Sequence, residues 1–413
     1  METLGLVLSG GGSKGAYQIG VYKALRKMNI KIDIVTGTSI GAINGMFVVQ
    51  KNLRKVLRFW KKISFEKIYK KEDFPKLTDE KLSKVYAQYL KTFINEGGMD
   101  VSKIKKMFDK YYKPNKFFNS EIDYGLVTYN FTKKKPVIKT KKDLNSLNTK
   151  DYVLASASCY PAFKPYTINN EIFIDGGYYD NIPINLAIKM GATQIIAVDL
   201  RTVGLKKKVI DESVEVIYIA PRNKIASFLV FDGKRAKEAI KFGYNDAMKT
   251  FGKLDGNKFT FKKNNLVKNY NKYNDLYEDN LRKIFINKKS KLASKIFENP
   301  LFNEILNRKT LYSDFNKIIE KAGKIFNLRE EKCYNIKRYN KKISKELKKI
   351  NQISVEEIIS NVKDKNIKGI LDSKKIVKFF YNSIITDSKS MIKYIPIFQK
   401  EFLVALYIYT INY

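Results

Sequence analysis

The sequence predicts an α/β fold in which helices flank a mainly parallel central sheet, followed by a mostly helical basic C-terminal region. A short apolar strand at residues 4–8 runs into the glycine-rich loop Gly10 to Gly15, and a helix with apolar residues near helical spacing follows at 16–28. A second strand at 32–35, a second glycine turn and a second helix at 42–49 repeat this unit. Repeated units of this kind are typical of parallel sheets covered by helices.

Later segments extend the α/β part of the chain. Strand patterns occur at 124–129, 136–139 and 171–174, and the apolar run from Gln194 to Leu200 suits the middle of a sheet. Asn185 to Met190 is expected to be a helix, because Gly191 follows it. The chain is 44% hydrophobic and has only nine prolines, so it has ample material for a core.

Changes in composition divide the 413 residues into domains. Residues 51–120 are rich in lysine and aromatic residues and mostly helical in pattern, which suggests an insertion beside the sheet. Beyond Gly256 the sequence becomes rich in Lys and Asn and helix-like, with 34 basic and 16 acidic residues in 256–413. We therefore predict an α/β domain over 1–255 that contains the helical insertion, and a helical lysine-rich domain of unknown role over 256–413.

The chain carries a large positive charge, because 79 Lys and Arg face 41 Asp and Glu, for a net charge of +38. Such a charge favours polyanions, either nucleic acid or an anionic membrane surface. Only ten of the basic residues are arginine, and bidentate recognition of phosphates and bases favours arginine over lysine. Dispersed lysine on solvated faces is the simpler interpretation. We expect no nucleic-acid partner, and an anionic membrane surface is a candidate partner.

Histidine is absent from the sequence. This excludes a Ser-His-Asp triad, a Cys-His pair, an HExxH zinc site and any imidazole proton shuttle, since each of them needs that side chain. The two cysteines, Cys159 and Cys333, form no CxxC motif, so neither a structural zinc site nor a disulfide framework is expected. Proton transfer must use carboxylates, lysine, tyrosine or water.

The sequence also suggests a location. We find no secretory signal, because Met1 to Thr3 runs straight into an apolar strand. The longest apolar run, Phe402 to Ile408, falls far short of the roughly 20 residues needed to span a bilayer. Together with the isolated cysteines, these features predict a cytoplasmic protein that is soluble or peripheral to a membrane.

Ser39 is the candidate nucleophile. It lies in Gly37-Thr38-Ser39-Ile40-Gly41, a GxSxG match between an apolar strand and a helix. In a nucleophile elbow the chain turns so tightly that side chains at the two glycine positions would collide with neighbouring backbone, and the turn exposes the serine hydroxyl. GxSxG also occurs in ordinary turns, and the strand-turn-helix context favours the elbow.

The loop Gly10-Gly11-Gly12-Ser13-Lys14-Gly15 has two interpretations. Gly10, Gly12 and Gly15 satisfy the GxGxxG dinucleotide fingerprint, in which pyrophosphate binds at a helix N-terminus. A glycine nest of this kind can instead hold the oxyanion that forms when Ser39 attacks an ester carbonyl. A dinucleotide site needs an acidic residue at the end of the second strand, where the serine elbow lies here, and Asp33 lies near that strand's start. The oxyanion interpretation is therefore favoured.

Asp175 is the leading proton acceptor for Ser39. It follows the strand 172–174 and precedes Gly176-Gly177, which places a carboxylate at a strand end where backbone can approach closely. Asp-Gly is also a common turn dipeptide, so an ordinary Asx turn is the alternative. Lys14 is the rival base, but a cation beside a glycine nest is better suited to stabilising an anion than to accepting a proton.

These motifs, taken together and in this order, resemble the patatin-like phospholipase family. The glycine loop is similar to the family's oxyanion-hole motif, the segment around Ser39 to its nucleophile elbow, and Asp175-Gly176-Gly177 to the motif of its catalytic aspartate. Residues 155–163, 181–183 and 194–200 are also similar to their family counterparts. The resemblance covers about residues 4–205, so the lysine-rich tail lies outside it.

The resemblance implies a serine lipid acyl hydrolase of the phospholipase A or lysophospholipase type. Ser39 would attack an acyl ester of a glycerolipid, Asp175 would take its proton, and the amides of Gly11 and Gly12 would stabilise the tetrahedral intermediate. Gly10, Lys14 and Gly15 would complete the oxyanion and substrate site. The resemblance implies a phospholipid or another acyl lipid as substrate, and no metal or organic cofactor.

Two other functions are compatible with the sequence. The same dyad permits acyl transfer to an acceptor other than water, and a catalytically silent basic lipid-binding protein could retain the scaffold. The terminal segment from Tyr394 to Tyr413 combines aromatic and aliphatic residues with Lys400, so it could be an interfacial anchor, although a packed terminal helix is the favoured interpretation. The sequence makes no prediction of the oligomeric state.

Overall fold

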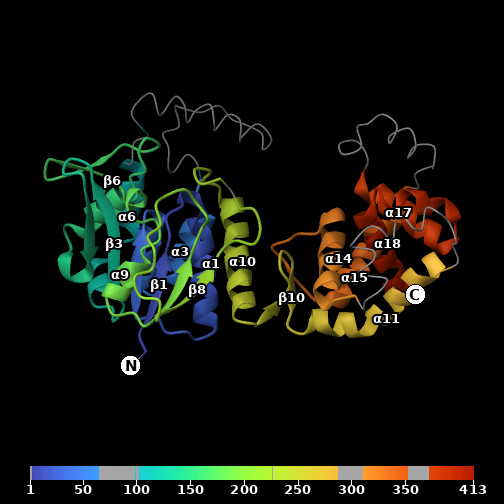
Figure 1. Ribbon diagram of the computed structural model, residues 1–413. Helices are drawn as coiled ribbons and strands as arrows, with labels where there is room; N and C mark the ends of the chain where they lie inside the picture. Colours follow the sequence, from blue (N-terminus) through green and yellow to red (C-terminus); the bar gives the residue numbers. More distant parts are fainter. Residues whose placement is uncertain (1, 65–97, 99–101, 226, 287–309, 352–371) are drawn as a thin grey trace. The chain divides into compact units, whose positions relative to one another are not determined.

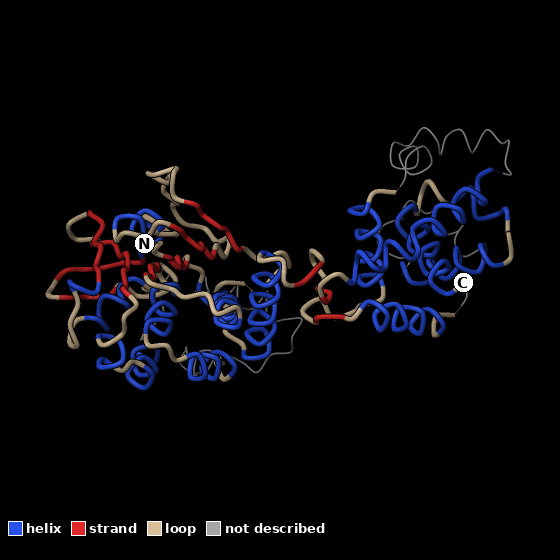
Figure 2. Tube along the Cα trace, turned by 90° about the horizontal axis from the view of Figure 1, so that it is seen from below, coloured by secondary structure: helices blue, strands red, loops and turns tan. Residues whose placement is uncertain are grey.

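The structure is a computed structural model, and it describes residues 2–64, 98, 102–225, 227–286, 310–351 and 372–413. The chain forms two compact units, Met1–Thr250 and Phe251–Tyr413, which we call unit 1 and unit 2. Figure 2 shows the strands gathered mainly in unit 1, whereas unit 2 is built mainly of helices. Each unit is described by itself.

Unit 1 is built on a mainly parallel sheet, as the sequence predicts (Figure 1). Five mutually parallel strands form its centre in the order β3-β2-β1-β7-β8. Strands β1, β2 and β7 are buried on both faces, which is typical of central strands covered by helices on each side. The strands are β1 (Leu4–Leu8), β2 (Ile34–Thr38), β3 (Asp123–Asn130), β7 (Gln194–Val198) and β8 (Glu215–Ile219).

Three antiparallel strands complete the sheet at one end, β4 (Lys135–Thr140), β5 (Tyr166–Ile168) and β6 (Glu171–Asp175). Since β4 pairs with the whole of Gly125 to Asn130, both β2 and β6 must use the opposite edge of β3. On that edge β2 ends with Thr38 beside Val127, and β6 ends with Asp175 beside Thr128. The two strands therefore meet end to end along β3.

Helices cover both faces of the sheet. Ile34 packs with Ala187 of α9 on one face, whereas the next residue, Val35, faces Gly45 of α2 on the other, as the alternation of a strand requires. Helices α1 and α10 pack side by side (Figure 1), and α10 also contacts β8. The helices are α1 (Ala16–Lys27), α2 (Ile40–Val49), α8 (Thr149–Ser156), α9 (Ile184–Lys189) and α10 (Gly233–Thr250).

Part of the predicted insertion at 51–120 lies outside the described residues, namely 65–97 and 99–101. Its described parts are helical, and they are α3 (Leu53–Lys61), α6 (Ser102–Tyr111) and α7 (Pro114–Phe118). Phe59 of α3 and Tyr111 of α6 stack against Phe47 of α2, so these helices extend the core beside the sheet.

Unit 2 is a helical body with a small three-stranded sheet in the order β11-β10-β9. Its last helix is buried along most of its length, from Phe402 to Ile408, and contacts four other helices of the unit. The terminal segment is thus a packed core helix and not an exposed anchor. The elements are β9 (Leu254–Asp255), β10 (Thr260–Lys262), α11 (Asn265–Ile286), α14 (Tyr312–Ile325), β11 (Cys333–Tyr334), α15 (Ile336–Lys348), α17 (Ser373–Ile385) and α18 (Gln399–Asn412).

Across the described ranges, none of the helices combines the length and the apolar character that crossing a bilayer requires.

Candidate active site

Ser39 occupies a strained turn between β2 and α2. Its backbone angles are φ 58° and ψ −128°, a conformation that costs a non-glycine residue energy and is characteristic of a nucleophile elbow. The flanking glycines allow the turn to close. A Cβ atom on Gly37 would lie 2.4 Å from the backbone of Gly41, and one on Gly41 would lie 2.1 Å from the carbonyl oxygen of Leu8.

Ser156, at the end of α8, connects the turn at Ser39 to the sheet through two hydrogen bonds. The Ser39 amide donates a hydrogen bond of 2.9 Å to the Ser156 hydroxyl, which in turn donates one of 2.7 Å to the carbonyl of Val127 in β3. All three groups are buried, so the serine links the strained turn to the centre of the sheet.

Asp175 lies beside Ser39 because β2 and β6 meet end to end on β3. Its carboxylate accepts a hydrogen bond of 2.8 Å from the Gly177 amide, and the Ser39 hydroxyl lies close enough to act on its pKa. The side chain is buried, and this desolvation raises the pKa of Asp175 from 3.8 to about 6, although the Ser39 hydroxyl and the Gly177 amide oppose the shift. A carboxylate with this pKa is mostly ionised at neutral pH and can still take up a proton.

The glycine loop borders the same space. Gly12 has φ +53°, and a Cβ atom there would lie 2.1 Å from the carbonyl oxygen of Phe228, so only glycine fits. The next amide, that of Ser13, donates to this carbonyl at 2.7 Å. By contrast, the amides of Gly11 and Gly12 donate to no group in the described part of the chain.

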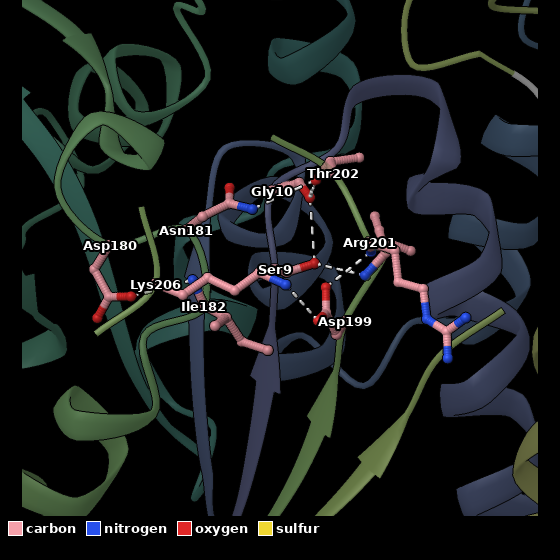
Figure 3. A network of polar contacts seen from close by, with 10 residues as sticks. Ser9, Gly10, Asp180, Asn181, Ile182, Asp199, Arg201, Thr202 and Lys206 are labelled. Atoms are coloured by element: carbon pink, nitrogen blue, oxygen red, sulfur yellow. Dashed lines mark hydrogen bonds and ion pairs between the residues drawn. The ribbon is translucent and has the colours of Figure 1, made fainter. Parts of the chain in front are cut away.

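A network of polar contacts fixes the orientation of the loop (Figure 3). The carbonyl of Gly10 accepts hydrogen bonds from the hydroxyls of Thr202, at 2.7 Å, and Ser9, at 3.2 Å. The Gly10 amide donates to the carbonyl of Asn181 at 3.0 Å. The Gly10–Gly11 peptide is trans, and in a trans peptide the N–H points away from the C=O. The hydrogen bonds to the Gly10 carbonyl therefore turn the Gly11 N–H away from Thr202 and Ser9.

Ser39 and Asp175 open onto a cavity of about 780 Å³. This volume is in the range of sites for organic ligands, roughly 300–1,000 Å³. The wall of the cavity carries the polar groups of Ser39, Asp175, the glycine loop, Asn181 and Thr202. Most of the other lining residues are apolar. The aromatic ones are Phe47, Phe59, Trp60, Phe108, Phe163, Tyr178, Phe228 and Phe231.

The structure brings together five of the seven residues that the sequence proposes for the site, namely Gly11, Gly12, Lys14, Ser39 and Asp175, which line the cavity. Burial lowers the pKa of the Lys14 amine, and the nearby carboxylate of Asp199 partly offsets this effect.

Gly10 and Gly15 do not line the cavity. A Cβ atom on Gly10 would lie 2.3 Å from the side-chain oxygen of Asn181, and one on Gly15 would lie 2.4 Å from the side chain of Ile40. Both glycines instead allow neighbouring side chains to pack closely against the loop.

Asp33 has no place in this site. It precedes β2, at the edge of the sheet opposite to the glycine loop, where its carboxylate accepts from the Leu4 amide at 3.0 Å and pairs with Lys31 at 3.3 Å. The dinucleotide alternative therefore lacks its acidic partner.

Three further residues belong to the site although the sequence predicts no role for them, namely Ser156, Asn181 and Thr202. The short segments around Ser156 and Asn181 resemble a known family, but nothing in them says which side chain points toward the elbow. Thr202 had a usable signal, because it follows β7, and parallel strands place their carboxyl ends at one edge of a sheet, where ligands bind.

The fold and the site define a class: an α/β domain with a serine on a nucleophile elbow, a buried carboxylate as its partner, and glycine amides facing an apolar cavity. No group of three or more acidic or cysteine side chains with the geometry of a metal site occurs among the residues described.

Comparison with known proteins finds a family match within unit 1. Residues 6–188 match the family model described as patatin-like phospholipase. Residues 6–188 of unit 1 therefore carry a patatin-like phospholipase domain, in agreement with the resemblance of its motifs.

Two relatives illustrate how far the similarity extends. Lysophospholipase NTE1 of Meyerozyma guilliermondii is 31% identical over 213 residues, which cover 49% of this chain and 13% of that protein. Patatin-like phospholipase domain-containing protein 7 of Rattus norvegicus is 27% identical over 204 residues, which cover 48% of this chain and 14% of that protein. This chain thus spans only about an eighth of the length of the curated relatives it matches.

Proposed function

We propose that the protein is a serine lipid acyl hydrolase that cleaves fatty acyl esters of glycerolipids, as a phospholipase A or lysophospholipase does. One observation carries the proposal. In a chain without histidine, Ser39 on its strained turn lies beside a buried carboxylate, Asp175, at the wall of a mostly apolar cavity. A serine nucleophile requires such a proton acceptor.

In this mechanism, Ser39 Oγ attacks the ester carbonyl carbon while its proton passes to the carboxylate of Asp175. The carbonyl oxygen becomes negative and accepts hydrogen bonds from the amides of Gly11 and Gly12, with Lys14 adding positive charge nearby. As the tetrahedral intermediate collapses, Asp175 returns the proton to the departing alcohol oxygen. Water then attacks the acyl-enzyme by the same steps in reverse and releases the fatty acid.

The cavity supports a lipid as substrate. Its aromatic and aliphatic lining offers an acyl chain a dry environment, and burial of each methylene contributes about 0.8 kcal/mol. The relatives that are named lysophospholipases favour a lysophospholipid among the glycerolipids. Such lipids reside at membranes, so we propose that the enzyme works as a peripheral protein on an anionic membrane surface. The two isolated cysteines of the sequence, Cys159 and Cys333, agree with a reducing cytoplasm.

Hydrolysis by wild type, Ser39→Ala and Asp175→Asn tests the proposal. Each protein is assayed on a short-chain nitrophenyl ester and on lysophosphatidylcholine, with thermal melting to show that the variants fold. We expect both substitutions to lower kcat by at least about a thousandfold, because the dyad acts as a unit. Equal turnover by the three proteins would refute the proposal.

A further inference from the structure

The loop that follows β7 combines exposed apolar residues with positive charge beside the cavity. We call residues 201–208, Arg201-Thr202-Val203-Gly204-Leu205-Lys206-Lys207-Lys208, the rim loop. Its first five residues line the cavity that holds Ser39 and Asp175. The rim loop therefore forms part of the border between the active site and solvent.

The rim loop is held in place at several points. The Leu205 amide donates to the carbonyl of Gly177 at 2.9 Å, and the Leu205 carbonyl accepts from the amide of Asn181 at 2.6 Å. Lys206 pairs with Asp199 at 2.6 Å and so ties the far side of the loop to the end of β7. These bonds attach the loop to the segment that carries Asp175, so its apolar side chains are presented in a fixed position.

Those apolar side chains face solvent. Val203 is fully exposed, and Leu205 is 60% exposed. Tyr178 and Phe228, which also line the cavity, are 46% and 38% exposed. Single exposed apolar residues are ordinary, but a group of them around the opening of one cavity marks a surface that contacts another apolar phase.

The positive charge of the rim loop indicates what kind of apolar phase this surface contacts. Arg201, Lys206, Lys207 and Lys208 give it four positive charges and no negative one. Lys206 and Lys208 pair with Asp199 and Glu212 just outside the loop, while Lys207 lies over the ring of Tyr179 at 4.1 Å. In an anionic bilayer, negative headgroups cover a hydrocarbon interior. Lysines complement the headgroups, and neighbouring aliphatic side chains complement the hydrocarbon.

We propose that the rim loop is the surface by which the protein docks on an anionic lipid bilayer. Val203 and Leu205 enter the boundary of the hydrocarbon, and Lys207 and Lys208 contact the headgroups. The cavity opening then faces the bilayer, and an acyl ester reaches Ser39 without crossing water. This inference rests on the proposed function, because docking serves to bring a lipid substrate to Ser39. Docking itself can be measured without catalysis.

Vesicle flotation in the Ser39→Ala background tests the apolar part of the proposal. The probe is a vesicle of phosphatidylcholine containing phosphatidylserine, and the test variant adds Val203→Asp and Leu205→Asp. We expect its partitioning onto vesicles to fall at least about tenfold, because each aliphatic side chain loses its apolar contact. The matched control adds Ile138→Asp and Leu147→Asp, which replace two exposed aliphatic residues of unit 1 outside the cavity lining and should bind like the parent.

Replacing two lysines tests the electrostatic part. Lys207→Gln with Lys208→Gln should weaken binding to the phosphatidylserine vesicles about tenfold and lessen its dependence on salt, with little effect on vesicles of phosphatidylcholine alone. Neither lysine lines the cavity. In the Ser39-containing protein, the same double variant should hydrolyse the soluble nitrophenyl ester at the wild-type rate.

The outcomes separate this inference from the proposed function. Binding that is unchanged in the rim-loop variants, equally weakened in the control, or absent in the Ser39→Ala parent would overturn docking through the rim loop, whatever the enzyme assays give. If the wild type binds vesicles through the rim loop but hydrolyses no ester, the proposed function fails and the docking surface stands. Thermal melting of each variant shows that lost binding is not lost folding.

Discussion

Asp175 is made suitable as a base by its burial. Removal from water disfavours its ionised form and raises its pKa to about 6, while the Ser39 hydroxyl and the Gly177 amide limit the shift. General-base catalysis is most effective when the pKa of the base lies near the working pH. In the proposed mechanism, a carboxylate with this pKa takes the role that histidine often has in related chemistry.

The pH dependence of hydrolysis should report this pKa. The ionised carboxylate accepts the proton of Ser39, so activity requires Asp175 to be deprotonated. We expect kcat/KM for a soluble ester to rise about tenfold per pH unit below pH 6 and to level off above about pH 7. Steady-state assays between pH 4.5 and about 8.5 measure the profile, and a flat profile across this range would contradict the role of Asp175.

Thr202 is the residue that we expect to orient the oxyanion donor. Its hydroxyl holds the carbonyl of Gly10, and the Gly11 amide lies on the other side of that peptide. Thr202→Val keeps the shape of the side chain and removes the hydrogen bond. We expect kcat to fall by about tenfold to a hundredfold with KM little changed, because an oxyanion donor acts mainly in the transition state.

Thr202→Ser is the matched control for this prediction, since it restores the hydroxyl. It should recover most of the wild-type kcat. Loss of activity in both variants, or a loss confined to KM, would show that Thr202 acts through packing or substrate binding and not through the peptide of Gly10 and Gly11.

At the scale of elements, the dyad depends on how strands meet. The end of β2 and the end of β6 converge on neighbouring residues of β3, Val127 and Thr128. This register brings the elbow and the carboxylate together although 136 positions of sequence separate Ser39 from Asp175. The helix α8 then stabilises the junction, since Ser156 connects the elbow to β3.

Ser156→Ala should therefore weaken both the fold and the site. The change removes both hydrogen bonds of the Ser156 hydroxyl, and a buried backbone group that loses its partner costs about 1–3 kcal/mol. We expect a lower melting temperature and a lower kcat, because the strained conformation of Ser39 loses a support. Calorimetry and ester assays measure the two effects. A variant with wild-type stability and activity would show that the elbow holds its conformation without α8.

The local elements of unit 1 could largely be predicted from the sequence, whereas their pairing could not. The strands at 4–8, 124–129 and 171–174 appear within a residue or so of the predicted bounds, since apolar runs and glycine turns are local signals. By contrast, β8 is short and partly exposed, and no pattern suggested it. The antiparallel pairing of β6 with β3, at the end of β2, is a long-range contact that local periodicity does not predict.

The same distinction applies to the site. Ser39 and Asp175 could be proposed from the sequence because each lies in a glycine turn at the end of a predicted strand. Gly10 and Gly15 were expected to touch the substrate, but the motif alone does not tell which glycines face the cavity and which pack against Asn181 and Ile40. The place of Thr202 after β7 was a usable signal, but its role could not be predicted, since its partner, the carbonyl of Gly10, lies 192 positions away.

At the scale of the whole molecule, unit 1 and unit 2 each have a core of their own. The described residues that line the active-site cavity lie between Gly11 and Phe231, within unit 1. Catalysis on a soluble ester should therefore not need unit 2.

Residues 1–250 produced alone should thus fold and hydrolyse a soluble nitrophenyl ester with kcat/KM within about threefold of the full chain, a difference of less than 1 kcal/mol in transition-state stabilisation. Circular dichroism and steady-state assays check the two parts of this expectation. A folded but inactive fragment would contradict this expectation and would show that catalysis needs unit 2.

The central claim is that Ser39 becomes covalently acylated with the help of Asp175. Rapid quenching of the protein with a slowly hydrolysed nitrophenyl ester, followed by mass spectrometry of its peptides, tests this claim most directly. We predict an added acyl group on the peptide that contains Ser39 in the wild type, and none in Ser39→Ala or, at the same early times, in Asp175→Asn. An acyl group on another residue, or equal acylation of the wild type and Asp175→Asn, would contradict it.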